Sequence, residues 1–320
     1  MKEQRGRITF WEVEVFLAVA DELSISAAAK RLGASASSIS QQLSNLESAL
    51  GCELVNRRER PLSLTAAGDR FRLRAQRIQN ELAEARAEAA ADSVSKITIL
   101  RIGMIEDFEA RVAPALLERL ANDLPGTRFE LATGATHRLL DHLESGALDV
   151  VVTGNPDLGG AALNTIPVLM DPFVAIAQKG ILAKGHPPED LLTLPFIRYT
   201  KRHVMGRVLD EHLTKQRVRL DQRYELDSYH SIMAMVASGG GWSILTALGV
   251  AHAQQHQGEV DVFPLPLAPL SRRLSVSSLA GGDTMVAELI ATHLRDLLND
   301  VVIKPGLRQL PWLSGQLRLL

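Results

Sequence analysis

The sequence predicts an α/β protein made of a helical N-terminal segment, one long helix, and a larger region in which strands alternate with helices. Apolar residues recur at helical spacing through residues 1–65. Residues 66–92 contain no proline and no glycine after Gly68, which indicates a single helix. From residue 93 to about residue 303, near-continuous apolar runs such as 150–152 alternate with amphipathic stretches, as buried parallel strands alternate with helices.

The composition favours a folded chain of two or three domains in a reducing compartment. Of the 320 residues, 46% are hydrophobic and 22% are charged, and the net charge is −2. The single cysteine, Cys52, excludes an internal disulfide framework, and we expect it to be a small core residue. A polar start and the lack of about 18 consecutive apolar residues predict neither a secretion signal nor a membrane span, so we expect a cytoplasmic protein.

Two short helices are predicted around a turn at Gly33. Ser24 and Ser26 are candidate N-caps of the first helix, and Ser35 or Ser37 can cap the second. The second helix has apolar residues at steps of four, three and four, namely Ile39, Leu43, Leu46 and Leu50, followed by Gly51 where a helix-ending glycine is expected. The result is a helix-turn-helix arrangement.

The opposite face of the second helix is polar and carries Ser38, Gln41, Gln42, Ser44 and Asn45. Amide side chains can hydrogen-bond base edges in the major groove of DNA. Every amphipathic surface helix has a polar face, so this feature alone does not separate a DNA-binding helix from an ordinary one.

The segment that follows favours DNA. Residues 53–57 and 62–64 are strand-like, and the turn between them, from Arg58 to Pro61, is rich in arginine. Between residues 55 and 78 there are seven arginines and two acids, a local balance of +5. A cationic β-hairpin beside a helix-turn-helix is suited to phosphate contacts, which supply most non-specific affinity for DNA.

The long helix predicts a dimer, although a short seam rich in alanine can also pack against neighbouring helices, or do both. Thr65 is a suitable N-cap, and apolar residues then recur at heptad spacing over nearly three repeats. This predicted dimerisation seam consists of Phe71, Ala75, Ile78, Leu82, Ala85 and Ala89.

These residues together resemble the N-terminal domain of LysR-type transcriptional regulators. The matching pattern runs Phe16-x-x-Val19, Leu23-Ser24-Ile25-Ser26-x-Ala28-Ala29-x-x-Leu32, Ser35-x-x-x-x-Ser40-x-x-x-x-Leu46-Glu47-x-x-Leu50-Gly51, then Leu64-Thr65-x-x-Gly68. The chain departs from the family at Ala36, where Gln is common, and at Val55, where Phe is usual.

The resemblance implies a winged helix-turn-helix (1–65), a linker and dimerisation helix (66–92) and an effector-binding domain (93–303). It implies that double-stranded promoter DNA is bound in the nucleoid by a dimer or a tetramer formed as a dimer of dimers, with RNA polymerase as a further candidate partner. Bases would face Ser38, Gln41, Gln42 and Asn45, and phosphates Arg31, Arg57, Arg58 and Arg60, while Ser35 and Ser37 complete the predicted DNA-binding set.

The region 93–303 contains a rough internal duplication of strand–helix units. Its two halves resemble the family's effector domain, which is itself like periplasmic binding proteins. We expect lobe I at about 93–160 and 270–303, lobe II at about 161–269, and two crossings near 161–177 and 262–275. Residues 304–320, with Pro305, Gly306 and Pro311, are expected to form a loosely attached extension.

Ligands of open parallel sheets sit beyond the carboxyl ends of the strands. This rule gives a set of candidate effector-binding residues: Ile105, Glu106, Thr133, Gly134, Thr153, Tyr199, Thr200, Lys201, Arg202, Asp227 and Ser228. Hydroxyl groups and free amides at helix starts could hold a carboxylate. The alternative is that the hydroxyls only cap helices. Glu106 and Asp107 would oppose an anion if they point inward, and would then favour an amine.

The remaining motifs add no second activity. Gly239, Gly240 and Gly241 are expected to form a tight helix-to-strand turn, and His252 and His256 lack a third metal ligand. We expect no metal and no cofactor besides a small-molecule co-inducer. Two other classes stay open, namely a small-molecule binding protein with a vestigial DNA-binding role and an enzyme of the α/β region.

Overall fold

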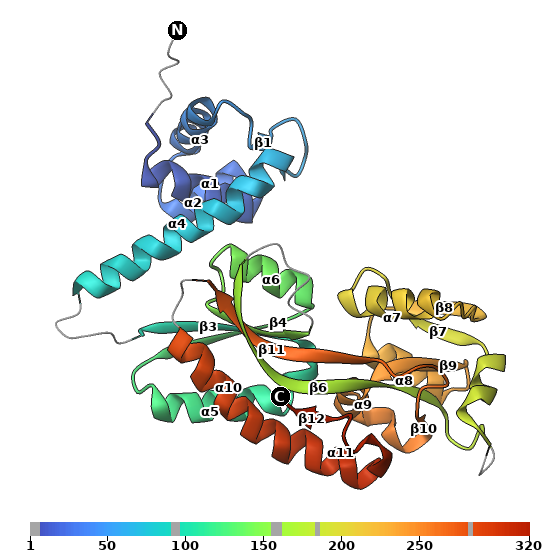
Figure 1. Cartoon of the computed structure of the whole chain (residues 1–320). Coiled ribbons are helices and arrows are strands. Elements are labelled where there is room, and N and C mark those ends of the chain that lie inside the picture. Colours follow the sequence, from blue (N-terminus) through green and yellow to red (C-terminus); the bar gives the residue numbers. More distant parts are fainter. Residues whose placement is uncertain (1–6, 91–96, 155–161, 183–185, 281–283) are drawn as a thin grey trace. The chain divides into compact units, whose positions relative to one another are not determined.

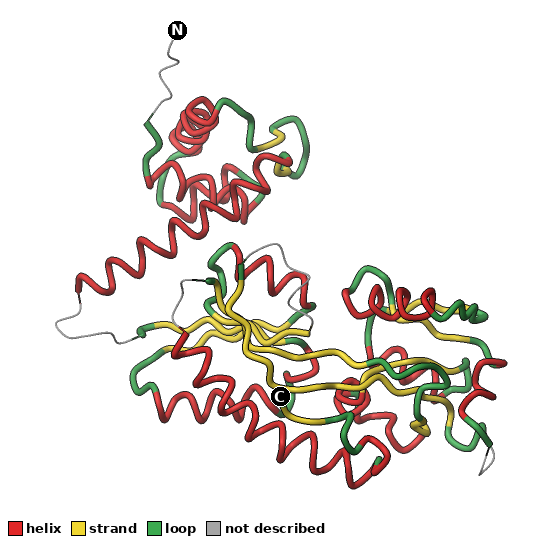
Figure 2. Tube along the Cα trace, viewed as in Figure 1, coloured by secondary structure: helices red, strands yellow, loops and turns green. Residues whose placement is uncertain are grey.

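The computed structural model describes residues 7–90, 97–154, 162–182, 186–280 and 284–320 (Figures 1 and 2). The chain divides into two compact parts near residue 98, and each part is described by itself. No helix of the described residues is both long enough and apolar enough to cross a membrane.

The first part begins with three helices, α1 (Phe10–Glu22), α2 (Ile25–Leu32) and α3 (Ala36–Leu50). The expected caps are confirmed, because the Ser24 and Ser35 hydroxyls accept bonds from the amides three residues later. Gly33 and Gly51 end α2 and α3 in the left-handed conformation, with φ of 64° and 71°. The apolar faces of the three helices meet in one core that includes Phe16, Ile39 and Leu43.

The predicted hairpin is present and short. Strands β1 (Val55–Asn56) and β2 (Ser63–Leu64) pair antiparallel, and Thr65 caps the long helix α4 (Ala66–Ala90). A Cβ atom at Gly68 would lie 2.1 Å from the Leu54 carbonyl oxygen. The first turn of α4 therefore needs glycine to pack against the start of the hairpin.

The predicted dimerisation seam needs correction at its N-terminal end. Ala75 is fully buried in the core of its own domain, and the Phe71 ring lies 5.2 Å from the ring of Phe16. These two residues therefore hold α4 onto α1 instead of facing a partner. Further along, Ile78 and Ala85 are exposed and Leu82 is half-buried, whereas the side chain of Ala89 lies outside the described residues.

The second part is built on one mixed sheet with the strand order β4-β3-β5-β11-β6-β9-β7-β8, with β10 and β12 also paired to β6. The strands are β3 (Ile99–Met104), β4 (Arg128–Thr133), β5 (Val150–Gly154), β6 (Leu163–Gln178), β7 (Phe196–Tyr199), β8 (Gln222–Leu226), β9 (Trp242–Thr246), β10 (Val260–Phe263), β11 (Ser271–Leu279) and β12 (Arg318–Leu319). Strands β3, β4 and β5 are parallel, and so are β7, β8 and β9.

Helices flank both halves of this sheet (Figure 1). Those of lobe I are α5 (Val112–Asp123), α6 (Thr136–Glu144) and α10 (Thr284–Leu298), and those of lobe II are α7 (Val204–Lys215), α8 (Tyr229–Ala237) and α9 (Ala247–His252). Short 3₁₀ turns lie at η1 (Glu106–Phe108), η3 (Pro188–Thr193) and η4 (Gln254–Glu259). At Gly241, φ is 141° and a Cβ atom would lie 2.1 Å from the Pro195 carbonyl oxygen, so the glycines do form the expected turn into β9.

Two long strands cross between the lobes, as expected. Strand β6 pairs with β11 over Leu163–Pro172, and from Phe173 onward it pairs with β9 and β10 of lobe II. Strand β11 returns the chain from β10 to lobe I, where it pairs with β5. Asp171 and Arg272 are register partners where the two crossing strands run side by side.

Two sequence-based expectations were wrong. Residues 304–320 are not a loose extension, because η5 (Asn299–Ile303), α11 (Lys304–Gln309) and η6 (Pro311–Leu313) lead into β12, which pairs with β6. Leu313 and Leu317 are 1% and 3% exposed, so this segment contributes to the core. Cys52 is exposed and not a core residue, because the chain turns outward after Gly51.

Candidate DNA-binding surface and effector cavity

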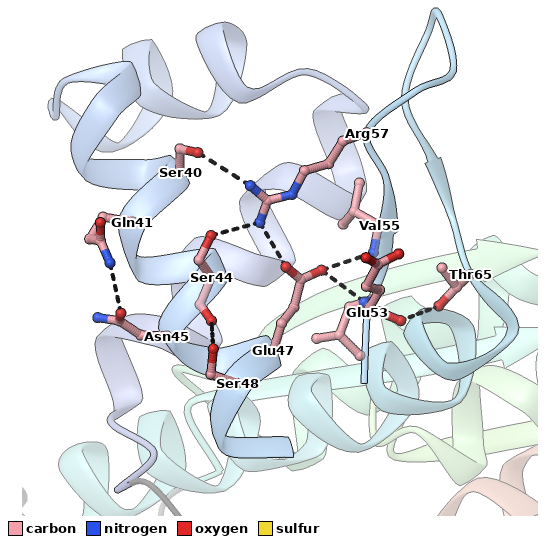
Figure 3. A network of polar contacts seen from close by, with 11 residues as sticks. Ser40, Gln41, Ser44, Asn45, Glu47, Ser48, Glu53, Val55, Arg57 and Thr65 are labelled. Carbon is pink, nitrogen blue, oxygen red and sulfur yellow. Dashed lines mark hydrogen bonds and ion pairs between the residues drawn. The ribbon is translucent and has the colours of Figure 1, made fainter. Parts of the chain in front are cut away.

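The polar face of α3 is solvent-accessible. Gln41 and Asn45 are exposed, one turn apart, and Gln41 Nε2 donates to Asn45 Oδ1 over 2.9 Å (Figure 3). Ser38 and Gln42 are half-buried on neighbouring positions. Opposite them, Ile39, Leu43 and Leu46 are fully buried, so the helix can present its amides outward without losing its core.

One arginine ties the hairpin to α3. Arg57 Nη2 donates to Glu47 Oε2 over 2.7 Å and to Ser44 Oγ over 2.9 Å (Figure 3). The other carboxylate oxygen, Glu47 Oε1, accepts from the backbone amides of Leu54 and Val55 over 2.8 and 3.3 Å. Glu47 therefore fixes the position of the hairpin relative to the helix, and the charge of Arg57 is balanced within the domain.

The other predicted cations differ in how free they are. Arg31 pairs with Asp21 and Glu22 over 3.2 and 3.4 Å. Arg58 and Arg60 lie exposed on the hairpin turn, and within the described part of the chain neither takes part in an ion pair. The two turn arginines are thus the cations of the hairpin that are available to an external anion.

A small cavity lies between the two lobes of the second part. Its volume is about 50 Å³, and it is bounded by the start of η1, the starts of α6, α7 and α8, and the side chain of Arg272 on β11. Its lining residues are Ile105, Glu106, Asp107, Gly134, Ala135, Thr136, Tyr199, His203, Val204, Met205, Tyr229 and Arg272. Neither His203 before α7 nor Ser228 before α8 caps its helix through its side chain, so first-turn amides stay available there.

A buried ionic network forms one wall of this cavity. Arg272 Nε donates to Asp171 Oδ2 over 2.9 Å, and its Nη2 donates to Asp107. The three side chains are at most 8% exposed. Thr246 Oγ1 accepts a further bond from Arg272 over 3.2 Å. Burial raises the pKa of Asp171, although Arg272 opposes that shift.

The aromatic residues of the cavity remain neutral over a wide pH range. Burial, reinforced by the charges of Asp107 and Glu106, raises the pKa of the Tyr199 hydroxyl. Burial likewise raises the pKa of Tyr229, whose ring lies 5.5 Å from that of Tyr199. Burial and the neighbouring His137 lower the pKa of His203. The cavity thus offers neutral hydroxyl and imidazole groups as hydrogen-bond partners at neutral pH.

The rule that ligands bind beyond the strand ends predicted some of the residues that line this cavity. Four of the predicted effector residues, Ile105, Glu106, Gly134 and Tyr199, line the cavity. The other seven, Thr133, Thr153, Thr200, Lys201, Arg202, Asp227 and Ser228, do not. Thr153 lies inside β5 and is fully buried, because that strand extends to Gly154, whereas the Thr200 hydroxyl donates to Glu225 instead of facing the cavity.

Sequence reasoning missed Arg272 and Tyr229. Arg272 lies on the return crossing, far in sequence from the strand ends that the rule considers, and its role depends on register with Asp171. Gly249 makes room for the Tyr229 ring, because a Cβ atom there would lie 2.3 Å from it, but this contact joins residues on different helices and has no local signal in the sequence.

The two parts of the chain match two family models. Residues 10–69 match the bacterial regulatory helix-turn-helix protein, lysR family, and residues 97–299 match the LysR substrate binding domain. The chain therefore belongs to the LysR family of DNA-binding transcriptional regulators.

Curated relatives agree with this assignment. HTH-type transcriptional regulator DgdR of Burkholderia cepacia is 33% identical over 260 residues, which cover 78% of this chain and 82% of that protein. A probable hydrogen peroxide-inducible genes activator of Mycobacterium avium is 32% identical over 209 residues, covering 64% of this chain and 67% of that protein.

Solved structures agree in fold. A cysteine-to-aspartate variant of full-length OxyR from Pseudomonas aeruginosa has a TM-score of 0.67 at 23% identity, covering 90% of this chain and 95% of that one. CbnR in complex with its target DNA has a TM-score of 0.62 at 20% identity, covering 90% of this chain and 99% of that one.

Proposed function

We propose that this regulator reads promoter DNA with α3 and the hairpin turn, and that a small carboxylate bound between the lobes controls it. The observation that carries the first half is the pairing of an outward amide face on α3 with two unpaired arginines on the adjacent turn. The bases are contacted by side chains of α3, namely Ser37, Ser38, Gln41, Gln42 and Asn45. The phosphates are contacted by Arg58 and Arg60.

The structure changes the proposed role of three other residues. Ser35 caps α3, so its hydroxyl already accepts a bond from the Ser38 amide. Arg57 positions the hairpin through Glu47 and contributes less charge to DNA than Arg58 does. Arg31 must release its acidic partners before it can contact a phosphate.

The carboxylate proposal rests on the polarity of the cavity walls. Helix starts place available amides there, and Arg272 offsets part of the charge of Asp107 and Asp171, which share it. Glu106 and the remaining carboxylate charge oppose an anion, so the amides have to outweigh them. A volume of about 50 Å³ is smaller than ordinary ligand pockets of roughly 300–1,000 Å³. An effector larger than a few atoms therefore needs the lobes to separate, and this movement acts on the Asp171–Arg272 pair of the crossing strands.

The free face of α4, including Ile78, Leu82 and Ala85, pairs two protomers, and a dimer of dimers gives the tetramer implied by the family. A dimer presents two recognition helices to two half-sites. The relatives described above are regulators and not enzymes, which favours binding over turnover by the α/β region. We further propose that the regulator acts on DNA in the cytoplasm, at the nucleoid, and that it contacts RNA polymerase there.

The DNA contacts are tested by measuring affinity for DNA flanking the regulator's own gene at several salt concentrations. Arg58→Ala is expected to lower the slope of log affinity against log salt by about 1, because one phosphate contact is lost. Arg57→Ala is expected to change the slope by less than half as much. Arg308→Ala, an exposed arginine on α11, is the matched control and leaves the slope unchanged. Equal slopes for Arg58→Ala and the wild type would refute the assignment.

The effector is tested by footprinting the same DNA with panels of small carboxylates and of small amines. A change in the footprint that requires a carboxylate supports the proposal. A change produced by amines alone would indicate that Glu106 binds a cationic effector, and it would refute the carboxylate proposal. Turnover of any panel member by the purified protein would favour the enzyme alternative.

A further inference from the structure

A second and larger cavity lies in the effector domain, away from the first. Its volume is about 230 Å³, and it lies between α9 and β10 of lobe II and the C-terminal segment η5–α11–η6. Figure 1 shows these elements grouped near the C-terminus. The segment that the sequence predicted to be loose is thus one wall of a cavity.

The lining is mainly aliphatic, and it is buried at its base and half-exposed toward solvent, where Ala251, Val262 and Leu310 lie. Val250, Val260 and Leu313 are 6%, 6% and 1% exposed, and no aromatic ring lines the cavity within the described residues. A ligand in this partly open space would cover aliphatic side chains that are otherwise half-exposed, and an apolar cavity of about 150 Å³ already admits benzene.

Two polar side chains lie in the lining, Arg111 and Gln309, and both are exposed. Arg111 precedes α5 and takes part in no ion pair among the residues that the structure describes. The cavity therefore combines a partly buried aliphatic lining with one cation that takes part in no ion pair among the described residues. That combination fits an amphipathic anion, because the chain is desolvated while the charge stays near water and the guanidinium.

We infer that this cavity is a second ligand site, for a small aliphatic carboxylate whose chain lies among the valines and leucines and whose carboxylate pairs with Arg111. The site is separate from the interlobe cavity, and the two have no lining residue in common. Helix α9 connects them, because its Leu248 amide donates to Asp171 over 3.1 Å while Ala251 on the same helix lines the second cavity.

The test is isothermal titration calorimetry on the full-length protein with hexanoate, hexan-1-ol and hexylammonium as probes. Hexanoate is expected to bind once per chain, and at least about tenfold more tightly than hexylammonium. Absence of hexanoate binding at millimolar concentration, or equal affinity for the three probes, overturns the inference.

Variants locate the site. Ala251→Leu fills the cavity from α9 and should abolish hexanoate binding, whereas Arg111→Gln should weaken it about tenfold and Arg111→Lys should restore most of it. Arg308→Gln is the matched control, since this exposed arginine of α11 does not line the cavity, and should leave affinity unchanged. Hexanoate binding that survives both Ala251→Leu and Arg111→Gln places the ligand elsewhere and refutes the site.

Discussion

Glu47 links the recognition helix to the hairpin, so its replacement tests how the DNA-binding surface is held together. In Glu47→Ala the amides of Leu54 and Val55 lose their acceptor, and both residues are at most 2% exposed. An unpaired buried amide costs about 1–3 kcal/mol. The lost bond to Arg57, which is 38% exposed, adds less than about 1 kcal/mol after solvent screening. We therefore expect the hairpin to open more easily by about 2 kcal/mol.

Hydrogen exchange of peptides that span residues 53–56, followed by mass spectrometry, measures this opening directly. A cost of about 2 kcal/mol corresponds to exchange about thirtyfold faster. Glu47→Gln is the matched control, because its amide oxygen can still accept from the backbone, and we expect less than about fivefold acceleration there. Unchanged protection in Glu47→Ala would refute the role assigned to this carboxylate.

Three further predictions concern the effector domain. Arg272→Gln should destabilise it by about 3–5 kcal/mol, because two buried carboxylates lose their cation, and an unchanged melting temperature would contradict this. Deletion of residues 311–320 should lower the melting temperature by several degrees, because it removes two buried leucines and β12, whereas a loose tail would have no effect. Since burial and His137 lower the pKa of His203, the unfolded state binds a proton first as pH falls below about 6.5, and stability decreases there. His203→Asn should therefore flatten the decrease in melting temperature between pH 7.5 and pH 5.5, and an unchanged pH profile would exclude this source.

The sequence was most informative where contacts are local. Caps at Ser24, Ser35 and Thr65, and the glycines after α2 and α3, depend on neighbours within four residues. The family pattern around these residues identified the DNA-binding domain, and the apolar run 150–152 indicated a buried strand, which the structure has as β5.

Tertiary structure decided which of the recognised side chains are free. Periodicity placed Phe71 and Ala75 on the same face of α4 as Ile78. In the structure, however, Phe71 and Ala75 pack against the core of their own domain. Charge counting grouped Arg57 with Arg58, yet only the register of the hairpin beside α3 brings Glu47 to one and not to the other. In the effector domain, Arg272 meets Asp107 and Asp171 across 165 and 101 residues of sequence, and the tail closes a second cavity through a strand pair with β6. Local patterns specify the elements, because caps and apolar faces act over a few residues. The pairing of distant segments decides which of their side chains contact each other and which stay free. The sequence does not show this, because long-range register has no local signature.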